Sequence, residues 1–310
     1  MLIYTLRRLA LLVPTVVGVV TVVFFLIHLI PGDPVEVMLG ESATPADRVE
    51  LRRALDLDRP LGSQYLSFLA ATARADLGRS IHSGQPVTRV IADRLPATIR
   101  LTIVAMVIAM FIALPFGLLS AWKPGSSIDR ASLLTAMLGV AIPNFWLGPM
   151  LILLFSIELG WLPVSGSSTP LHLLLPAITL GTAMAGLLAR LTRSTVLEAL
   201  HEDYVRTARA KGLSEASVVA RHALANALTP LLSVLGLQFG GLLAGSIITE
   251  TIFAWPGIGR LVVQAIHTRD YPVVQGCVLI IALSYVIVNL ATDLAYALVN
   301  PRVRYGNGDG

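Results

Sequence analysis

The stretch DYVRTARAKGLSEASVVARHALANALTP, residues 203–230, decides the fold of this chain. It is a charged, helix-forming segment, yet the sequence on either side of it is apolar for about twenty residues, the length that crosses a bilayer. A segment of this kind between two spans predicts a structured loop at one mouth of a membrane bundle. Its cations are Arg206, Arg209, Lys211 and Arg221.

The local pattern of this stretch predicts two short helices separated by a glycine turn. Strong helix formers run from Asp203 to Lys211, and Gly212 stands where a C-terminal cap is expected. Ser214 is then placed to cap a second helix. Periodicity alone leaves open that both helices merely lie at the lipid headgroups. The residues expected along one face of the second helix are Ala216, Ala220, Leu224, Ala227 and Leu228.

Composition places the whole chain in a membrane. Of 310 residues, 55% are hydrophobic and 14% are charged, whereas a soluble domain is about a quarter charged. The net charge of +4 is accounted for by cations in the loops between spans, so it does not indicate nucleic acid. A single cysteine, Cys277, excludes an intrachain disulfide and a cysteine-based metal site.

Hydropathy predicts an all-α, polytopic bundle of six transmembrane helices. The first apolar run is too long for the apolar part of a signal peptide, and PGDP follows it without a cleavage pattern, so we expect a retained span. Prolines and glycines inside several spans are tolerated because neighbouring helices satisfy the freed backbone groups. The expected spans are 9–30, 98–121, 132–159, 174–198, 228–252 and 273–299.

Lysines and arginines in the short loops predict that both termini are cytoplasmic. Residues 31–97 then form a long outer loop, and 300–310 a cytoplasmic tail. We expect this loop to fold as a small helical cap, with helices opening at Thr44 and Ser63. Leu66, Leu69, Ala73 and Leu77 are expected to face inward from the second of them. The expected inner cations are Arg7, Arg8, Lys123, Arg130, six cations between Arg190 and Arg221, Arg302 and Arg304.

Signatures of catalysis do not occur in the sequence. It has no G-x-x-x-x-G-K-[ST] phosphate loop, no H-E-x-x-H and no G-x-S-x-G, and its six histidines are scattered. We therefore expect a chain that is not an enzyme and that holds no metal.

Polar residues within the spans are candidates for lining a path. Asp293 follows Asn289 by one helical turn, so both share a face. For Asp293, near the inner interface, a structural role in pairing or capping is the favoured interpretation. Glu158 and Glu250 stand at outer span ends, where an interfacial position is expected. The candidate path residues are Asn144, Gln238, Asn289 and Asp293.

YVRTARAKG and RHALANALTP resemble the cytoplasmic loop of ATP-binding-cassette (ABC) importer permeases, in the dipeptide/oligopeptide/nickel branch. Arg206 stands where the wider superfamily has glutamate, which is normal for the branch. Ala225 stands where the branch has arginine, which puts one cytoplasmic contact in doubt. The resemblance covers residues 1–305. Further matching stretches are LIPGDP, LDLDRP, DLGRS, LPATI, ELGWLP, ETIFAWPGIGR and RDYPVVQ.

The resemblance implies a type I importer permease in a prokaryotic inner membrane. Residues 1–93 would form an N-terminal span and an outer domain, and 94–299 the core. It implies a second homologous permease, two cytoplasmic ATPases that bind the ATP and magnesium, and an outer substrate-binding protein, with no cofactor in this chain. Residues 203–212 would be the helix that couples to the ATPase. The implied coupling residues are Tyr204, Arg206, Thr207, Ala208, Arg209, Lys211 and Gly212.

The resemblance also implies an outer gate or binding-protein contact and a substrate class. The implied substrates are dipeptides, oligopeptides or glutathione; nickel chelates and oligosaccharides are alternatives. A secondary transporter or channel without an ATPase would instead carry buried charges and internal repeats. The outer residues concerned are Trp255, Pro256, Gly257, Arg260 and Asp270.

Overall fold

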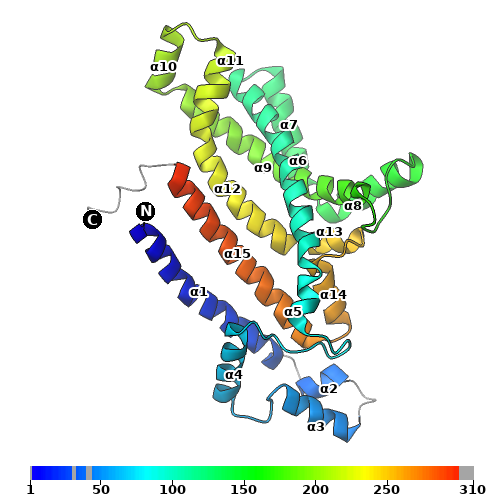
Figure 1. The fold of residues 1–310 in the computed structure, drawn as a ribbon. Coiled ribbons are helices and arrows are strands. Elements are labelled where there is room, and N and C mark those ends of the chain that lie inside the picture. The colour runs from blue at the N-terminus through cyan, green and yellow to red at the C-terminus, as the bar shows by residue number, and fades with distance from the viewer. Residues whose placement is uncertain (1, 30–32, 40–43, 300–310) are drawn as a thin grey trace.

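The computed structural model describes residues 2–29, 33–39 and 44–299 (Figure 1). Within these ranges the chain is helical and contains no strand, only one isolated β-bridge between Arg79 and Pro86. The predicted all-α class is confirmed. The expected tail at 300–310 lies outside the described residues.

Four helices are each long and apolar enough to cross a membrane. They are α1 (Leu2–His28), α6 (Leu95–Trp122), α9 (Leu174–Leu200) and α15 (Tyr271–Val299). Two further helix pairs pass the same test only when each bent pair is taken as one span. The six-span prediction therefore corresponds to four continuous helices and two broken ones.

The third expected span, 132–159, is not one helix. Helix α7 (Ser127–Ala141) and helix α8 (Asn144–Leu151) meet at 98°, and a π-helix, η1 (Ile152–Glu158), continues α8. The break has a covalent cause: Pro143 lacks an N–H and forces the residue before it out of the helical region. Ile142 accordingly has ψ 116°.

The fifth expected span, 228–252, begins and ends earlier than predicted. Its helix starts with α11 (Glu215–Ser217) and the π-helix η3 (Val218–Ala223), continues as α12 (Leu224–Gly245), and bends by 55° at Pro230. A separate short helix, α13 (Ile247–Ile252), follows.

The expected outer cap is helical and lies at the end of the bundle opposite the helix α10 (Asp203–Ala210) (Figure 1). Its helices are α2 (Pro34–Leu39), α3 (Pro45–Ala54), α4 (Leu61–Ala73) and α5 (Val87–Ala92). The remaining helices are η2 (Pro170–Leu173), before α9, and α14 (Ile258–His267), before α15.

The predicted helix start at Thr44 is confirmed. The amide of Asp47 donates to the Thr44 hydroxyl at 3.2 Å, and the Thr44 amide donates to the Asp47 carboxylate at 2.9 Å. Hydrogen bonds from Thr44 lower the pKa of Asp47. A purely local pattern sufficed here because both partners lie within one turn.

The second expected outer helix starts at Leu61, before the predicted Ser63, and the Ser63 hydroxyl donates back to the carbonyl of Pro60. Its predicted inward face is partly correct: Leu69 and Leu77 pack against the buried cluster that contains Val20 and Val23, whereas Leu66 is 64% exposed. Helix α4 also contacts α1 through polar groups. The Gln64 amide oxygen and a His28 ring nitrogen lie 3.0 Å apart, and the Tyr65 and Thr21 hydroxyls lie 2.8 Å apart.

Small residues let α6 and α9 pack closely. A Cβ on Gly117 would lie 2.6 Å from Thr192, and a Cβ on Gly181 would lie 2.7 Å from the carbonyl oxygen of Ala105. Close contacts of this kind are a usual basis of helix association in lipid. The hydrophobic effect does not drive helices together there, because lipid tails are as apolar as the side chains. The two helices therefore form one closely packed unit.

An ion pair holds α7 against α9 at the end of the bundle near α10. The Arg193 guanidinium donates twice to the Asp129 carboxylate, Nε to Oδ1 at 2.7 Å and Nη2 to Oδ2 at 2.8 Å. The same carboxylate accepts from the amide of Gly125 at 2.8 Å and from the hydroxyl of Ser120. Asp129 is 3% exposed, so its charge is stabilised by these partners in place of water.

We predict that Asp129→Asn destabilises the folded chain by about 3 kcal/mol, because it leaves the charge of the Arg193 guanidinium without its buried counter-ion. Unfolding in mixed detergent micelles measures the loss. The matched control is Glu215→Gln, which removes the same charge from an exposed pair with Arg209 and should cost much less, because water screens an exposed pair. Equal losses in the two variants would contradict the role given to Asp129.

Candidate functional site

The loop between the fourth and fifth spans has the predicted helix–glycine–helix form. Helix α10 ends within one residue of the expected position, and Gly212 follows with φ +76°, a conformation that favours glycine. The amide of Ser217 donates to the Ser214 hydroxyl at 3.4 Å, so Ser214 caps the next helix as expected. Sequence reasoning found this unit because each of its signals is local.

Helix α10 has one packed face and one exposed face. Val205 and Ala208 are buried against Val218 of η3. Ala208, expected among the coupling residues, therefore lies on the packed face, and the side chain of Arg206 is 76% exposed. The cationic side of the helix is thus presented to the surroundings. The exposed candidates are Tyr204, Arg206, Thr207, Arg209, Lys211 and Gly212.

A bidentate ion pair spans the glycine turn. Arg209 Nε donates to Glu215 Oε1 at 2.7 Å and Arg209 Nη2 donates to Glu215 Oε2 at 3.2 Å. Glu215 raises the pKa of the Arg209 guanidinium. The pair links α10 to the helix that follows it, and the buried apolar contact through Val205 holds α10 in place.

The predicted face of the second helix is partly correct. Ala227 is buried and Leu224 packs against the same cluster, as expected, whereas Ala216, Ala220 and Leu228 are exposed. Val219 and Ala223 are buried instead. The π-helix η3 lies between the two parts of this face, and its wider turn departs from the spacing of 3.6 residues per turn on which the prediction was based.

At the end of the bundle opposite α10, a buried carboxyl group organises the turn between α13 and α14. Glu250, expected at the interface, is 0% exposed, which corrects that expectation. Its Oε1 accepts from the hydroxyls of Thr98 at 2.7 Å and Ser246 at 3.0 Å, and its Oε2 accepts from the amide of Arg260 at 3.0 Å. The carboxyl group thus lies at the N-terminus of α14, where backbone amides are unpaired.

The outer turn is packed against this carboxylate. A Cβ on Gly257 would lie 2.3 Å from the carboxyl group of Glu250. Trp255 is 6% exposed, its amide donates to the carbonyl of Glu250 at 2.8 Å, and its indole Nε1 donates to the carbonyl of Ala97 at 2.9 Å. The indole therefore joins the turn to the start of α6. The sequence analysis did not identify Thr98 as a partner of Glu250. The sequence signal for this site was the position of Glu250 itself, an acid in an apolar run before the turn at Pro256 and Gly257.

Asp270 connects the turn before α15 to the outer loop. Its carboxylate accepts from the Ser80 hydroxyl at 2.6 Å and from the amide of Ile81 at 3.3 Å. The His82 ring nitrogen Nε2 contacts the carbonyl of Thr268 at 2.5 Å. Asp270 is 4% exposed, so it acts within the fold and joins the N-terminal part of the chain to the core.

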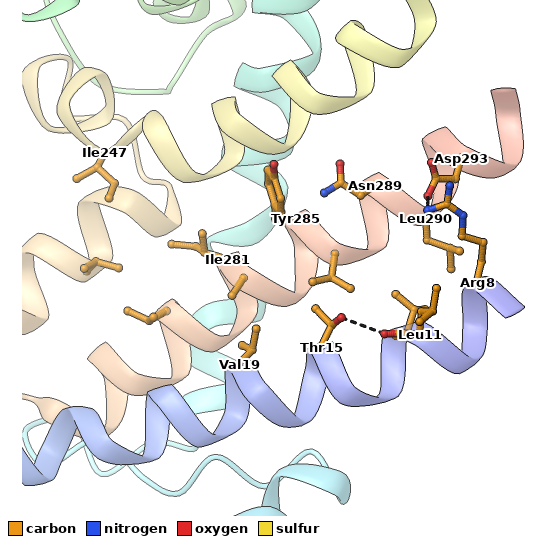
Figure 2. A pocket seen from close by; sticks show the side chains of 15 residues that line it. Arg8, Leu11, Thr15, Val19, Ile247, Ile281, Tyr285, Asn289, Leu290 and Asp293 are labelled. Atoms are coloured by element: carbon orange, nitrogen blue, oxygen red, sulfur yellow. Dashed lines mark hydrogen bonds and ion pairs between the residues drawn. The ribbon is translucent and has the colours of Figure 1, made fainter.

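Two of the four candidate path residues, Asn289 and Asp293, line a cavity of about 720 Å³ between α1 and α15 (Figure 2). Arg8 Nη1 lies 2.6 Å from Asp293 Oδ2 at one end of it, which is a pairing of the kind expected for Asp293. Asn144 and Gln238 lie elsewhere, at the start of α8 and on α12. The four residues are not brought together in one place.

Comparison with solved structures identifies the fold. A chain of the inward-facing MetNI methionine ABC transporter superposes with a TM-score of 0.58, at 18% identity over 68% of this chain and 96% of that chain. A chain of an amino acid ABC transporter determined with histidines gives a TM-score of 0.51, at 19% identity over 69% and 94%. The bundle therefore has the fold of a chain of an ABC transporter.

Comparison of sequences defines the family. The sequence model described as "Binding-protein-dependent transport system inner membrane component" matches residues 113–305, and "Binding-prot-dependent transport system membrane comp, N-term" matches residues 1–102. The chain belongs to this family of binding-protein-dependent transport system inner membrane components. It spans the membrane more than once.

Three curated relatives match 98% of this chain. The dipeptide transport system permease protein DppB of Alkalihalophilus pseudofirmus is 43% identical and is covered over its whole length. The glutathione transport system permease protein GsiC of Pectobacterium atrosepticum is 45% identical and is also wholly covered. The di/tripeptide transport system permease protein DppB of Pseudomonas aeruginosa is 46% identical, with 99% covered.

We predict that Gly257→Ala destabilises the chain by about 2–4 kcal/mol, because the added methyl group must displace a carboxylate that buried hydrogen bonds hold in place. Thermal unfolding in detergent measures the effect. Gly241→Ala is the matched control, since a Cβ there meets nothing within 4 Å and the helix gains from alanine. A Gly257→Ala chain as stable as the Gly241→Ala chain would show that the carboxylate is not fixed.

Proposed function

We propose that this chain is the permease subunit of an ATP-driven importer and forms half of a transmembrane path for small peptides, dipeptides or glutathione included. The observation that carries this proposal is the match to peptide and glutathione permeases over 98% of the chain. The other half of the path comes from a second, homologous permease, and a binding protein delivers the substrate from outside.

Helix α10 is the contact that we propose for a cytoplasmic ATPase. It lies at the end of the bundle opposite the outer helices α2, α3 and α4 (Figure 1). It exposes cations, while Val205 and Ala208 hold it to the bundle and Arg209 holds it to the next helix. A short helix fixed at several points can transmit movement of a partner to the spans as rigid-body rotation.

The proposed orientation follows from this contact. With α10 in the cytoplasm, α1 begins inside and the segment from α2 to α5 lies outside, facing the binding protein. The membrane is then the inner membrane of a prokaryote. In this assignment two ATPase subunits bind ATP and magnesium, and this chain supplies the path and the lever without a cofactor of its own.

We expect the complex of both permeases and both ATPases, reconstituted in liposomes with its binding protein, to accumulate labelled dialanine only when ATP is present. The isolated chain should hydrolyse no ATP, since its sequence has no phosphate loop. Uptake is measured by filtration and hydrolysis by phosphate release. Accumulation without ATP, or hydrolysis by the isolated chain, would contradict the proposal.

We predict that Gly212→Val abolishes most uptake while the protein still inserts, because φ +76° is strained for a β-branched residue. Nothing lies within 4 Å of the added Cβ, so the effect comes from the backbone alone. Gly212→Asn is the control, because asparagine tolerates this conformation, and it should retain at least about half of the uptake. Co-purification of the ATPase with each variant locates the defect. Normal uptake by Gly212→Val would argue against a coupling role for this turn.

A further inference from the structure

A second cavity, of about 660 Å³, lies at the outer end of the chain. The end of α5, the start of α6 and the turn between α13 and α14 all contribute to it. It is separate from the cavity between α1 and α15, and its lining is far more polar in composition. The lining residues that matter here are Ser83, Gln85, Asp93, Arg94, Arg100 and Trp255.

Three charged groups line this cavity without serving the fold. Within the described part of the chain, Arg94, Arg100 and Asp93 have no ion-pair partner. Arg193, by contrast, forms an ion pair with Asp129. Two cations and one anion are therefore available to a molecule that enters the cavity.

The wall of the cavity includes residues of the turn between α13 and α14. Trp255 and Pro256 form part of its wall. The indole of Trp255 donates to the carbonyl of Ala97, which lies between Arg94 and Arg100 in the chain. The amide of Ile258 donates to the Thr98 hydroxyl at 2.8 Å. A molecule bound by the two arginines would thus touch the segment that the buried Glu250 carboxylate holds in place.

The chemistry of the lining fits a zwitterion. Guanidinium groups bind carboxylates through paired N–H donors, and a carboxylate such as that of Asp93 attracts an ammonium group. A simple anion would use the arginines but would be repelled by Asp93. The volume lies within the range of about 300–1,000 Å³ that is usual for small-molecule sites. Ser83 and Gln85 add hydrogen-bonding groups for peptide amides.

We propose that this cavity is a reception site for free peptides at the outer mouth of the path. In it, Arg94 and Arg100 hold the C-terminal carboxylate and Asp93 holds the N-terminal ammonium of the peptide. The inference rests on the proposed function and adds to it a site on the permease itself. Binding is weak, because the charged groups are at least partly exposed and salt screens them, and weak binding suits a site that must release its ligand inward.

The test uses the complete complex without binding protein and measures equilibrium binding of labelled dialanine. The wild-type complex should bind dialanine about 10-fold more tightly than alanyl-alanine amide, whose C-terminus has no charge. Arg100→Gln and Arg94→Gln should each weaken dialanine binding by about 10-fold and bring it close to the affinity for the amide. Because the amide probes unaltered protein, the result does not depend on the folding of a variant.

Two controls complete the design. Arg89→Gln removes the same charge from an exposed residue of α5 outside the cavity and should leave dialanine binding unchanged. Asp93→Asn should reduce the preference for dialanine over its N-acetyl derivative, while the preference for acid over amide is kept. This pattern would assign the C-terminal carboxylate of the peptide to the arginines and its N-terminal ammonium to Asp93.

Several results would overturn the inference. One is equal affinity of the wild-type complex for dialanine and its amide; another is unchanged binding in both arginine variants. A third is that the arginine variants lose affinity for the binding protein while they bind free peptide as the wild type does. That result would make the cavity a protein-docking surface. The proposed function is tested separately by ATP-dependent uptake in the wild-type complex. If uptake occurs while the arginine variants behave as wild type, only the reception site is refuted.

Discussion

The burial of the Glu250 carboxylate is the constraint on which the outer half of this molecule depends. A charged group away from water is tolerated only when hydrogen bonds replace its hydration. Here the donors come from α6 through Thr98, from Ser246 before α13, and from the amide of Arg260 in α14. Three elements are therefore held at one point. That point places Trp255, and Trp255 closes one side of the cavity that we propose for peptides.

The inner end has a corresponding polar contact in the pair of Asp129 and Arg193. It joins α7 to α9, and α9 leads directly into α10. Between the two ends, small residues such as Gly117 and Gly181 let α6 and α9 pack without gaps. A bundle tied at both ends and closely packed between them moves as a unit. This property is the one that a subunit driven from outside itself requires.

Sequence patterns succeeded where the governing interaction is local. The helix ending before Gly212 and the caps at Thr44 and Ser214 each depend on partners within a few residues. They failed where the period changed. In and before the π-helix η3 the buried face passes through Val219 and not through the expected Ala216 and Ala220, and none of the residues of η3 signals a wider turn. Family resemblance supplied the order of the segments but could not supply these faces.

The sequence by itself determined the apolar segments and the form of the loop at 203–230, because length, hydropathy and helix capping depend on neighbouring residues. Only the tertiary structure decided which polar groups meet. Thr98 and Glu250 lie 152 residues apart, and Asp129 and Arg193 lie 64 apart. No sequence periodicity connects such pairs. An acid such as Glu250 can lie at the interface or be buried, depending on which helix packs against it. The cavity with Arg94 and Arg100 exists for the same reason: packing alone brought the outer turn against the start of α6.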